Sequence, residues 1–300
     1  MVAKLKKILN LCEEATQLRL RKACESRGAS AYPKVRVADV LRIEHSGIKP
    51  EQYEFALKAH FDFVITDSEH NPRFAVEFDG PAHHMTEQRK KDTLKEELCK
   101  RFDFLLLRIN FNYLPKKYRQ MDLLSWLVEV WFQAKEFAEA QEKGEVAYDE
   151  PFIPGSFLAL PGRAQQFPLW LSLDARAEIW KLHLAGECCQ DVPSSAVGRA
   201  SDGNYRAIAF VLVRPDCGVL AETGMRSQLF PIPISEALED IVVLELFEKL
   251  KMALKGKNEV LPMSVIEARC KTFRSHYNVL AAFACESNSP LLDVSAETAS

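Results

Sequence analysis

The alternation of apolar and polar residues in the first half of the chain predicts a mixed α/β unit. Apolar residues recur every three or four positions in some segments, as on one face of a helix, and gather in short β-branched or aromatic runs in others. The predicted helices are 4–25, 51–60, 86–101 and 118–142. The predicted strands are 35–41, 61–66, 73–79 and 104–109. This order is typical of a mixed central sheet flanked by helices.

Proline and glycine cluster between residues 143 and 168, which predicts a linker. We therefore expect a first domain over 1–142 and a small α+β domain over 169–286, followed by a polar, disordered tail over 287–300. The elements predicted within the second domain are helices 172–184 and 235–255 and a hairpin of 205–214 with 218–222. Nothing in the sequence assigns a role to this domain.

The composition is that of an ordinary globular protein. The 300 residues are 47% hydrophobic and 27% charged, with a net charge of −3. The apolar run 207–213 is too short to span a membrane, and no secretory signal is recognisable at the start. The eight cysteines form no CxxC pair, which favours a reduced, cytoplasmic setting. No GxSxG, P-loop or GxGxxG motif occurs, which argues against serine hydrolases, NTPases and Rossmann enzymes.

Charge is distributed unevenly along the chain. Residues 1–42 hold ten basic and four acidic side chains, a net +6 that leaves −9 for the remainder. A basic N-terminal surface could hold nucleic-acid phosphates. The alternative is a solvated helix face without such a role, and the charge count leaves both interpretations open.

The predicted hairpin places acidic residues together. If the turn-rich segment between its strands forms the loop, Thr66 lies opposite Arg73 and Asp62 lies opposite Glu77. Asp79 follows two residues later on the same face. His60 would lie opposite Asp79. The other face is then apolar: Phe61, Phe63, Ile65, Phe74, Val76 and Phe78.

Opposed carboxylates on a partly buried sheet face repel one another unless a proton or a cation intervenes. A divalent ion would resolve the conflict, and hard oxygen ligands favour Mg²⁺ or Mn²⁺. Such an ion activates water and stabilises charge on a phosphodiester. The alternative is a solvent-exposed face on which Asp79 only begins a turn. Geometry alone does not choose between the two.

A family resemblance favours the metal site. The run FDFVIT, followed by FAVEFDGPAHH and QRKKDTLKEELCKRFDFLLLRI, resembles the core of the PD-(D/E)XK nuclease superfamily. It is most similar to the branch of very-short-patch-repair-like endonucleases and a related domain of unknown function often found with helicase and defence proteins. The resemblance covers about residues 1–142, and its specific part is 61–109. It implies a restriction-endonuclease-like fold.

The resemblance also implies roles for individual residues. Asp62 and Glu77 match the metal-binding and catalytic acids, and Asp79 would join the metal ligands. Asp79 stands where the superfamily usually has lysine. The resemblance therefore implies that Lys95, on the following helix, takes the catalytic role of that lysine. The alternative for Lys95 is a solvated helix charge.

Further residues near these acids are candidates for the site. His83 matches a Gly-x-x-His pattern and would act as a general acid, although a surface histidine without a role is an equal alternative. Gln88, Arg89 and Lys91 would contact substrate phosphates. One of the two first-helix glutamates, Glu13 or Glu14, would supply a further acid, and the sequence does not show which.

Together these features predict an Mg²⁺-dependent or Mn²⁺-dependent nuclease acting on DNA rather than RNA, in repair or anti-phage defence. A helicase or another defence-system protein is the candidate partner, and no membrane role is expected. The competing hypothesis is a catalytically silent nucleic-acid-binding or scaffold module of the same fold, which the missing lysine at position 79 supports. A ribonuclease of the same fold is a third reading.

Overall fold

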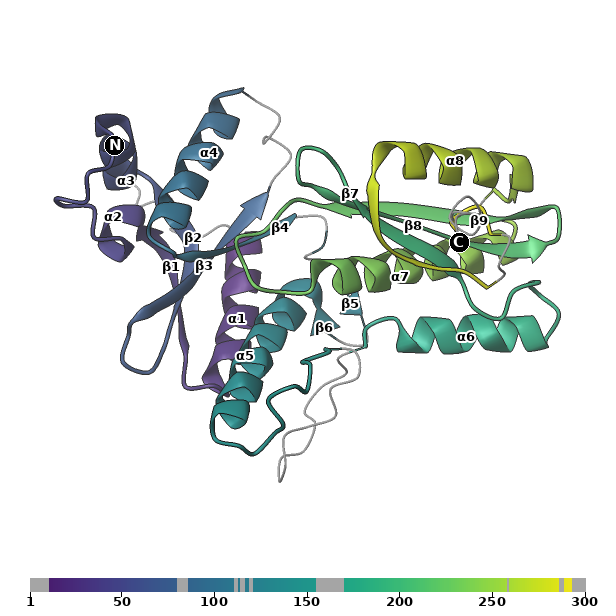
Figure 1. Ribbon diagram of the computed structural model, residues 1–300, viewed down its shortest axis with the longest axis horizontal. Helices are drawn as coiled ribbons and strands as arrows, with labels where there is room; N and C mark the ends of the chain where they lie inside the picture. Colours follow the sequence, from purple (N-terminus) through teal and green to yellow (C-terminus); the bar gives the residue numbers. More distant parts are fainter. Residues whose placement is uncertain are drawn as a thin grey trace, which may run out of the picture. The chain divides into compact units, whose positions relative to one another are not determined.

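The computed structural model describes most of the chain (Figure 1). The described residues are 11–79, 86–110, 113, 117–118, 121–154, 170–257, 259–285 and 289–292. They form eight helices, a four-stranded mixed sheet and a five-stranded antiparallel sheet, so the fold class is mixed α+β. The chain divides into two compact units. Unit 1 comprises Met1–Asp149 and Gln228–Ile232, and unit 2 comprises Glu150–Ser227 and Pro233–Ser300.

Unit 1 is built on the mixed sheet, whose strand order is β1-β2-β3-β4. Its strands are β1 (Ser30–Arg36), β2 (His60–Thr66), β3 (Pro72–Asp79) and β4 (Leu105–Asn110). The first three strands pair antiparallel, whereas β3 and β4 pair parallel. A parallel pair requires a crossover, and the helix α4 (Thr86–Arg101) provides it.

Helices cover both faces of this sheet (Figure 1). One face carries α4 together with α2 (Val37–Val40) and α3 (Pro50–Lys58). The other carries α1 (Leu11–Glu25) and α5 (Leu123–Glu142), the latter preceded by the two-residue strands β5 (Lys117–Tyr118) and β6 (Met121–Asp122). The Asp122 carboxylate caps α5 by accepting a hydrogen bond from the Ser125 N–H at 3.1 Å.

The core of unit 1 follows the alternation of the strands, with one correction. On the α1–α5 face the Phe74 ring packs 4.8 Å from the Trp131 ring. The sequence places Phe61 on that face, but it packs on the α4 face with Val64. The reason is an irregularity beside it, where Lys34 in β1 has a φ of 54° and the β1–β2 ladder omits Lys34 and its neighbour Asp62.

The predicted strand 35–41 is wrong in its second half. Strand β1 ends at Arg36, and the next four residues form the helical turn α2. The Val37 N–H donates to the Ala59 carbonyl at 2.9 Å, and the buried Val37 and Leu41 side chains pack in the core cluster beneath α3 and α4. Tertiary packing therefore overrides the β-propensity of this run.

The other elements predicted in unit 1 are present with shifted ends. Helix α4 has the predicted bounds, and α3, β2, β3 and β4 begin or end within two residues of expectation. Helix α1 is described from Leu11, and residues 4–10 lie outside the described part. Helix α5 begins at Leu123, five residues later than predicted.

Unit 2 is built on the antiparallel sheet, with strand order β10-β9-β8-β7-β11. Its strands are β7 (Ser194–Arg199), β8 (Tyr205–Arg214), β9 (Cys217–Met225), β10 (Leu261–Pro262) and β11 (Asn278–Phe283). Its helices are α6 (Leu173–Leu184), α7 (Ile234–Leu254) and α8 (Met263–His276). The predicted hairpin and both predicted helices are present. Strands β7, β10 and β11 and helix α8 were not predicted from the sequence.

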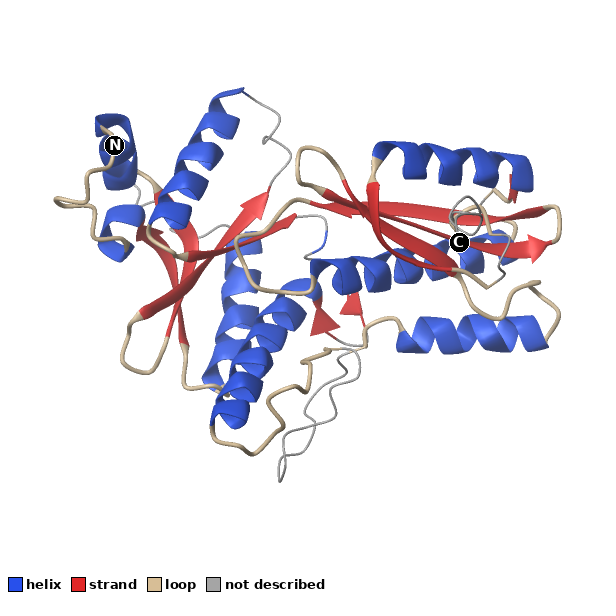
Figure 2. Ribbon diagram, viewed as in Figure 1, coloured by secondary structure: helices blue, strands red, loops and turns tan. Residues whose placement is uncertain are grey.

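Helices α7 and α8 lie on opposite faces of this sheet (Figure 2). The α8 face buries Ile208 and Phe210 of β8 against Ile266 and Cys270 of α8. Helix α7 contributes buried residues along its whole length, from Ile234 to Ala253.

The short segment Gln228–Ile232 belongs to unit 1, although it is flanked in sequence by β9 and α7. The Leu106 N–H donates to the Leu229 carbonyl at 2.9 Å, and the Phe230 ring lies 5.0 Å from the Phe74 ring. This segment therefore extends the sheet of unit 1 beside β4. The linker predicted over 143–168 includes the division after Asp149. Residues 155–169 and most of the predicted tail lie outside the described part.

Within the described residues, no helix combines the length and the apolar character that a membrane crossing requires.

Candidate functional site

The strands β2 and β3 separate where their acidic residues begin. Their ladder runs through Val64 opposite Ala75 and ends at Phe63 opposite Val76. Beyond that point, the Asp62 N–H donates to Glu77 Oε1 at 3.2 Å. Side-chain oxygens thus replace main-chain oxygens as hydrogen-bond acceptors, and the two carboxylates are brought together as the hairpin geometry anticipates.

The opposite bond completes the junction. The Phe78 N–H donates to Asp62 Oδ2 at 3.1 Å, so each strand is bound by a carboxylate of the other. At the far end of the hairpin the predicted partner of Thr66 is wrong, because Thr66 pairs with Pro72 across a bulge. The cause is Asp67, whose Oδ1 accepts the Glu69 and Asn71 N–H groups and closes a tighter loop.

Lys95 reaches this junction from α4. Its Nζ lies 2.7 Å from Glu77 Oε1 and donates to the His60 main-chain oxygen at 2.8 Å. The helix presents Lys95 to the sheet because Leu98 and Cys99, one turn later, are fully buried on the same side. Lys95 is itself only 8% exposed, so it is not a solvated helix charge.

Lys34 and Glu13 extend the site on its other side. Lys34 Nζ lies 2.8 Å from Asp62 Oδ1 and 2.7 Å from Glu13 Oε1. Burial alone would lower the pKa of Lys34, but its contacts with Asp62 and Glu13 outweigh burial and raise that pKa above its ordinary value. Of the two glutamates that the sequence left open, Glu13 is the one that joins Asp62, through Lys34.

Asp79 has a different charged partner. The Arg108 Nη1 lies 3.4 Å from Asp79 Oδ1 and 3.4 Å from Asp92 Oδ1, and Arg108 Nε lies 3.2 Å from Glu96 Oε1. The Arg108 side chain is only 2% exposed. Burial would lower the pKa of Arg108, but the surrounding carboxylates, that of Glu77 first, raise it.

The main chain of Arg108 is also fixed. Its N–H donates to Gln228 Oε1 at 2.8 Å, and Gln228 Nε2 donates to its carbonyl at 2.9 Å. The register between β3 and β4 also positions Arg108, because the parallel pairing sets Glu77 beside Arg108 and Asp79 beside Asn110. The segment from Gln228 onward therefore holds β4 in the position from which Arg108 meets Asp79.

These contacts change the electrostatic argument. From the sequence, a metal ion, a proton or exposure to solvent would relieve the repulsion among Asp62, Glu77 and Asp79. The structure supplies three internal cations instead, Lys34, Lys95 and Arg108. Burial raises the pKa of Glu77, while the neighbouring Lys95 charge opposes that rise. The negative charge of these carboxylates is thus balanced by basic side chains of the protein itself. A divalent ion is not needed to hold the fold together.

The remaining predicted residues are not brought to the junction by any described contact. His83 lies outside the described residues, as does the side chain of Gln88. Arg89 and Lys91 are exposed on α4, and Lys91 lines a groove of about 730 Å³ between α3 and α4. Across the described residues, no group of three or more His, Cys, Asp or Glu side chains is arranged to hold a metal ion.

The basic side chains near the N-terminus are neutralised in part by acidic partners within unit 1. Lys4, Lys6 and Lys7 lie outside the described residues. Among the described residues, the ion pairs made by the other basic residues of this region are Arg19 with Asp122, Arg21 with Glu25, Arg27 with Glu129 and Glu136, Arg36 with Asp39, and Lys34 with Glu13 and Asp62. The net count of +6 already includes the acids of residues 1–42. The pairs of Arg19, Arg27 and Lys34 with Asp122, Glu129, Glu136 and Asp62 lie outside that count, so it overstates the charge available to a polyanion.

Sequence reasoning missed Lys34, Arg108 and Gln228 as members of the site. Arg108 is the second-last residue of the run on which the resemblance rests, and this was the one available signal. Lys34 sits in an ordinary-looking strand, and nothing in the sequence shows its left-handed conformation. Gln228 lies 120 positions beyond Arg108 in the sequence. No local pattern links the two.

Comparison with known proteins agrees with the extent of unit 1 only in part. No curated protein and no solved structure matches the chain. One family model matches, over less than half of the chain. The match covers residues 5–123 of the chain, which include Asp62, Glu77 and Lys95. The family is described as Protein of unknown function (DUF2726).

Proposed function

We propose that unit 1 is a metal-dependent nuclease of the PD-(D/E)XK type that hydrolyses phosphodiester bonds, of DNA before RNA. The observation that carries the proposal is the convergence of Asp62, Glu77 and Lys95 where β2 and β3 separate. Two acids and a lysine are the residue types that the resemblance requires. Glu77 contacts both the Asp62 N–H and the Lys95 ammonium, although Lys95 is on another element.

The donor set suits a hard divalent ion. Asp62 and Glu77 present carboxylate oxygens, and Mg²⁺ typically takes one or two protein carboxylates together with water and substrate phosphate. The Asp62 side chain is 21% exposed, whereas that of Glu77 is 9% exposed. Asp62 is therefore the carboxylate through which solvent or substrate reaches the site. When bound, Mg²⁺ or Mn²⁺ would lower the pKa of a coordinated water and place a positive charge beside the phosphate.

The chain's own residues would contribute position and charge. Lys95 is fixed by Glu77 and by the His60 carbonyl, so its ammonium is held in place before substrate arrives. A fixed positive charge beside a reacting phosphodiester stabilises the transition state without the cost of reorganisation. Lys34 orients the Asp62 carboxylate from the side opposite to the Phe78 N–H.

One observation favours a second function. Because Lys34, Lys95 and Arg108 already compensate the acids, the same geometry would serve a catalytically silent nucleic-acid-binding or scaffold module. Asp79 is paired with Arg108 and does not carry the positive charge that the superfamily usually places there. A role in repair or anti-phage defence, with a helicase or similar protein as partner, rests on the resemblance alone.

Cleavage assays separate the two functions. The full-length protein is incubated with single-stranded DNA, duplex DNA and RNA in Mg²⁺, Mn²⁺ or EDTA, beside Asp62→Asn, Glu77→Gln and Lys95→Gln. Glu69→Gln, at an exposed position in the loop of the same hairpin, is the control. The nuclease predicts metal-dependent cutting that falls roughly 100-fold or more in the three site variants and little in the control. Binding without cutting by the wild type would reject the nuclease in favour of the silent module.

A further inference from the structure

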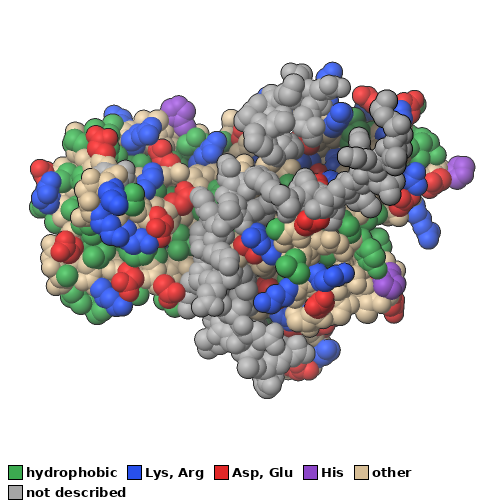
Figure 3. All heavy atoms as spheres, turned by 180° about the vertical axis from the view of Figure 1, so that it is seen from behind, with side chains coloured by type: hydrophobic (Ala, Val, Ile, Leu, Met, Phe, Trp, Pro, Cys, Tyr) green, Lys and Arg blue, Asp and Glu red, His purple; other side chains and the backbone are tan. Residues whose placement is uncertain are grey.

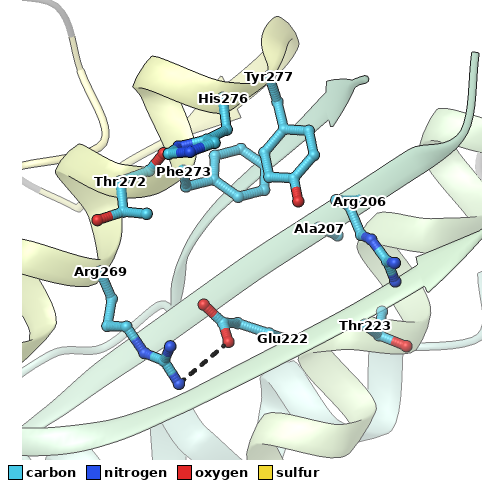
Figure 4. Close-up of a pocket in the computed structure, with 9 residues that line it drawn as sticks. All are labelled: Arg206, Ala207, Glu222, Thr223, Arg269, Thr272, Phe273, His276 and Tyr277. Carbon is cyan, nitrogen blue, oxygen red and sulfur yellow. Dashed lines mark hydrogen bonds and ion pairs between the residues drawn. The ribbon is translucent and has the colours of Figure 1, made fainter. Parts of the chain in front are cut away.

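Unit 2 contains a pocket that the proposed nuclease does not use. It has a volume of about 350 Å³ and lies between α8 and the strands β8 and β9 (Figure 4). We call it the α8 pocket. The residues that matter for its chemistry are Arg206, Glu222, Arg269, Phe273, His276 and Tyr277. The volume of the α8 pocket is within the usual range for pockets that bind small ligands.

Glycines on both neighbouring strands make room for the pocket. Arg206 in β8 lies opposite Gly198 of β7 and opposite Gly224 of β9. A Cβ atom at Gly224 would overlap the Arg206 side chain, and one at Gly198 would lie 2.7 Å from Tyr277 Cβ. The absence of side chains at these two positions lets Arg206 lie across the sheet and lets Tyr277 approach it closely.

Two hydrogen-bond donors in the pocket lack partners. Within the described part of the chain, neither the Arg206 guanidinium nor the Tyr277 hydroxyl forms a hydrogen bond or an ion pair. Figure 4 shows the Tyr277 hydroxyl directed toward Ala207, next to Arg206 along β8. Arg269 differs, because its Nη2 lies 3.4 Å from Glu222 Oε2. The guanidinium without a direct ion-pair partner in the pocket is therefore that of Arg206. Its charge is felt only at longer range by Asp202, whose pKa is lowered first by the Asn204 N–H and to a smaller extent by Arg206.

The end of α8 is compatible with an anion in the pocket. The free carbonyls of a helix C-terminus normally disfavour negative charge. Here the His276 Nδ1 donates to the Thr272 carbonyl at 2.8 Å, and the Tyr277 N–H donates to the Phe273 carbonyl at 3.0 Å. Both carbonyls are engaged, which weakens their repulsion of an anionic ligand.

Aromatic side chains form one wall. The Phe273 and Tyr277 ring centroids lie 4.9 Å apart, and those of His276 and Tyr277 lie 6.5 Å apart. An aromatic wall beside an unpaired guanidinium is the combination on which bases stack while phosphates are neutralised. On the face of unit 2 drawn in Figure 3, Lys and Arg side chains are interspersed with Asp and Glu. That face has no broad basic surface to attract a long polyanion.

We propose that the α8 pocket binds a nucleotide, with its phosphate on the Arg206 guanidinium and the Tyr277 hydroxyl and its base against the aromatic wall. The nucleotide is either free or part of a single strand, since both offer the same phosphate and base. This inference does not depend on nuclease activity in unit 1.

Titration of the full-length protein in EDTA tests the proposal, because metal-dependent binding elsewhere is then suppressed. The ligands are AMP, adenosine, inorganic phosphate and a short single-stranded oligonucleotide with hydroxyl ends. We expect affinity for AMP or for the oligonucleotide to fall about tenfold in Arg206→Gln, which loses a charge-assisted hydrogen bond. In Tyr277→Phe, which loses a neutral one, it should fall about threefold.

Arg214→Gln is the matched control. Arg214 lies at the far end of the same strand, its side chain is 70% exposed, and it does not line the pocket. Its affinity should equal that of the wild type. Arg206-dependent binding of the oligonucleotide but not of AMP would support the proposal with a single strand as the source. The proposal fails if neither ligand binds, if the two pocket variants bind like the wild type, or if adenosine or phosphate alone binds as tightly as AMP.

Discussion

Glu77 in unit 1 and Asp240 in unit 2 are both buried carboxylates, and burial raises the pKa of each. Their partners differ. Glu77 faces the Lys95 ammonium at 2.7 Å. Asp240 faces neutral donors, accepting the Leu171 N–H at 3.1 Å and the Ser172 hydroxyl. A raised pKa is therefore common to both sites and does not by itself distinguish a functional carboxylate from a structural one.

The surroundings make the distinction. Asp240 joins α7 to the start of α6, and the nearby Arg176 is bound to the Ser172 hydroxyl and to Glu239. Each of these bonds has a structural use. At Glu77, a second acid, Asp62, is held close by, with its own lysine. A cluster of opposite charges held together at one point is typical of a functional site. Packing of the fold alone does not require such a cluster.

Removal of Lys95 would make Glu77 resemble Asp240. In Lys95→Met, Glu77 stays buried without its ammonium partner, which should destabilise unit 1 by roughly 3–5 kcal/mol. The double variant Lys95→Met with Glu77→Gln should recover part of this loss, because no uncompensated charge remains. Denaturant unfolding of the two single variants and the double variant measures the coupling. Strictly additive effects would contradict the pairing.

The raised pKa of Asp240 predicts that the stability of unit 2 depends on pH. Burial raises the pKa of Asp240 from its ordinary 3.8 to about 6. The folded state then holds this proton more tightly than the unfolded state, so the contribution of Asp240 is complete below pH 3.8 and is lost as pH rises through about 6. Two pKa units correspond to about 2–3 kcal/mol.

Asp240→Asn removes that titration. The stability of the variant relative to the wild type should therefore increase between pH 4 and pH 8, by up to about 2–3 kcal/mol. Thermal unfolding across this pH range measures the difference. Asp216→Asn, at an 84% exposed side chain of unit 2, should show no such trend. A flat difference for Asp240→Asn would mean that the carboxylate is ionised in the fold without penalty.

Lys34 should have the smallest effect on stability. Its side chain is 35% exposed, so Lys34→Met should change the unfolding free energy by less than about 1 kcal/mol. The same change frees Asp62 Oδ1 from an ammonium, so affinity for Mn²⁺ should rise, by about threefold. Arg36→Met in the same strand is the control, since Arg36 pairs only with the exposed Asp39. Weaker Mn²⁺ binding in Lys34→Met would show that Lys34 supports the metal site instead of competing with it.

Much of unit 1 follows from sequence because its signals are local. The hairpin, α4 and α5 rest on periodicity, and the opposition of Asp62 and Glu77 follows from strand pairing. The misassigned run 35–41 shows the limit. Its residues favour a strand, but burial of Val37 and Leu41 beneath α3 and α4 selects a helical turn. Propensity is a weak guide where packing decides.

The site itself was predictable only in part. Lys95 could be predicted because the family resemblance assigns it a catalytic role and the helix period places it toward the sheet. Arg108 and Gln228 could not, since their meeting depends on a segment that joins unit 1 from far along the chain. Lys34 reaches Asp62 from a backbone conformation, with φ of 54°, that no residue pattern signals. The charges that neutralise the acids were therefore the part that sequence did not reveal.

Calorimetric titration of Mn²⁺ into the wild type, Glu77→Gln and the loop control Glu69→Gln shows whether the junction of Asp62 and Glu77 binds a divalent ion. We expect one site in the wild type and the control, with affinity weaker by roughly tenfold or more in Glu77→Gln because one of two carboxylate ligands is lost. No binding by the wild type, or equal binding by Glu77→Gln, would show that Lys34 and Lys95 are the only cations this junction takes.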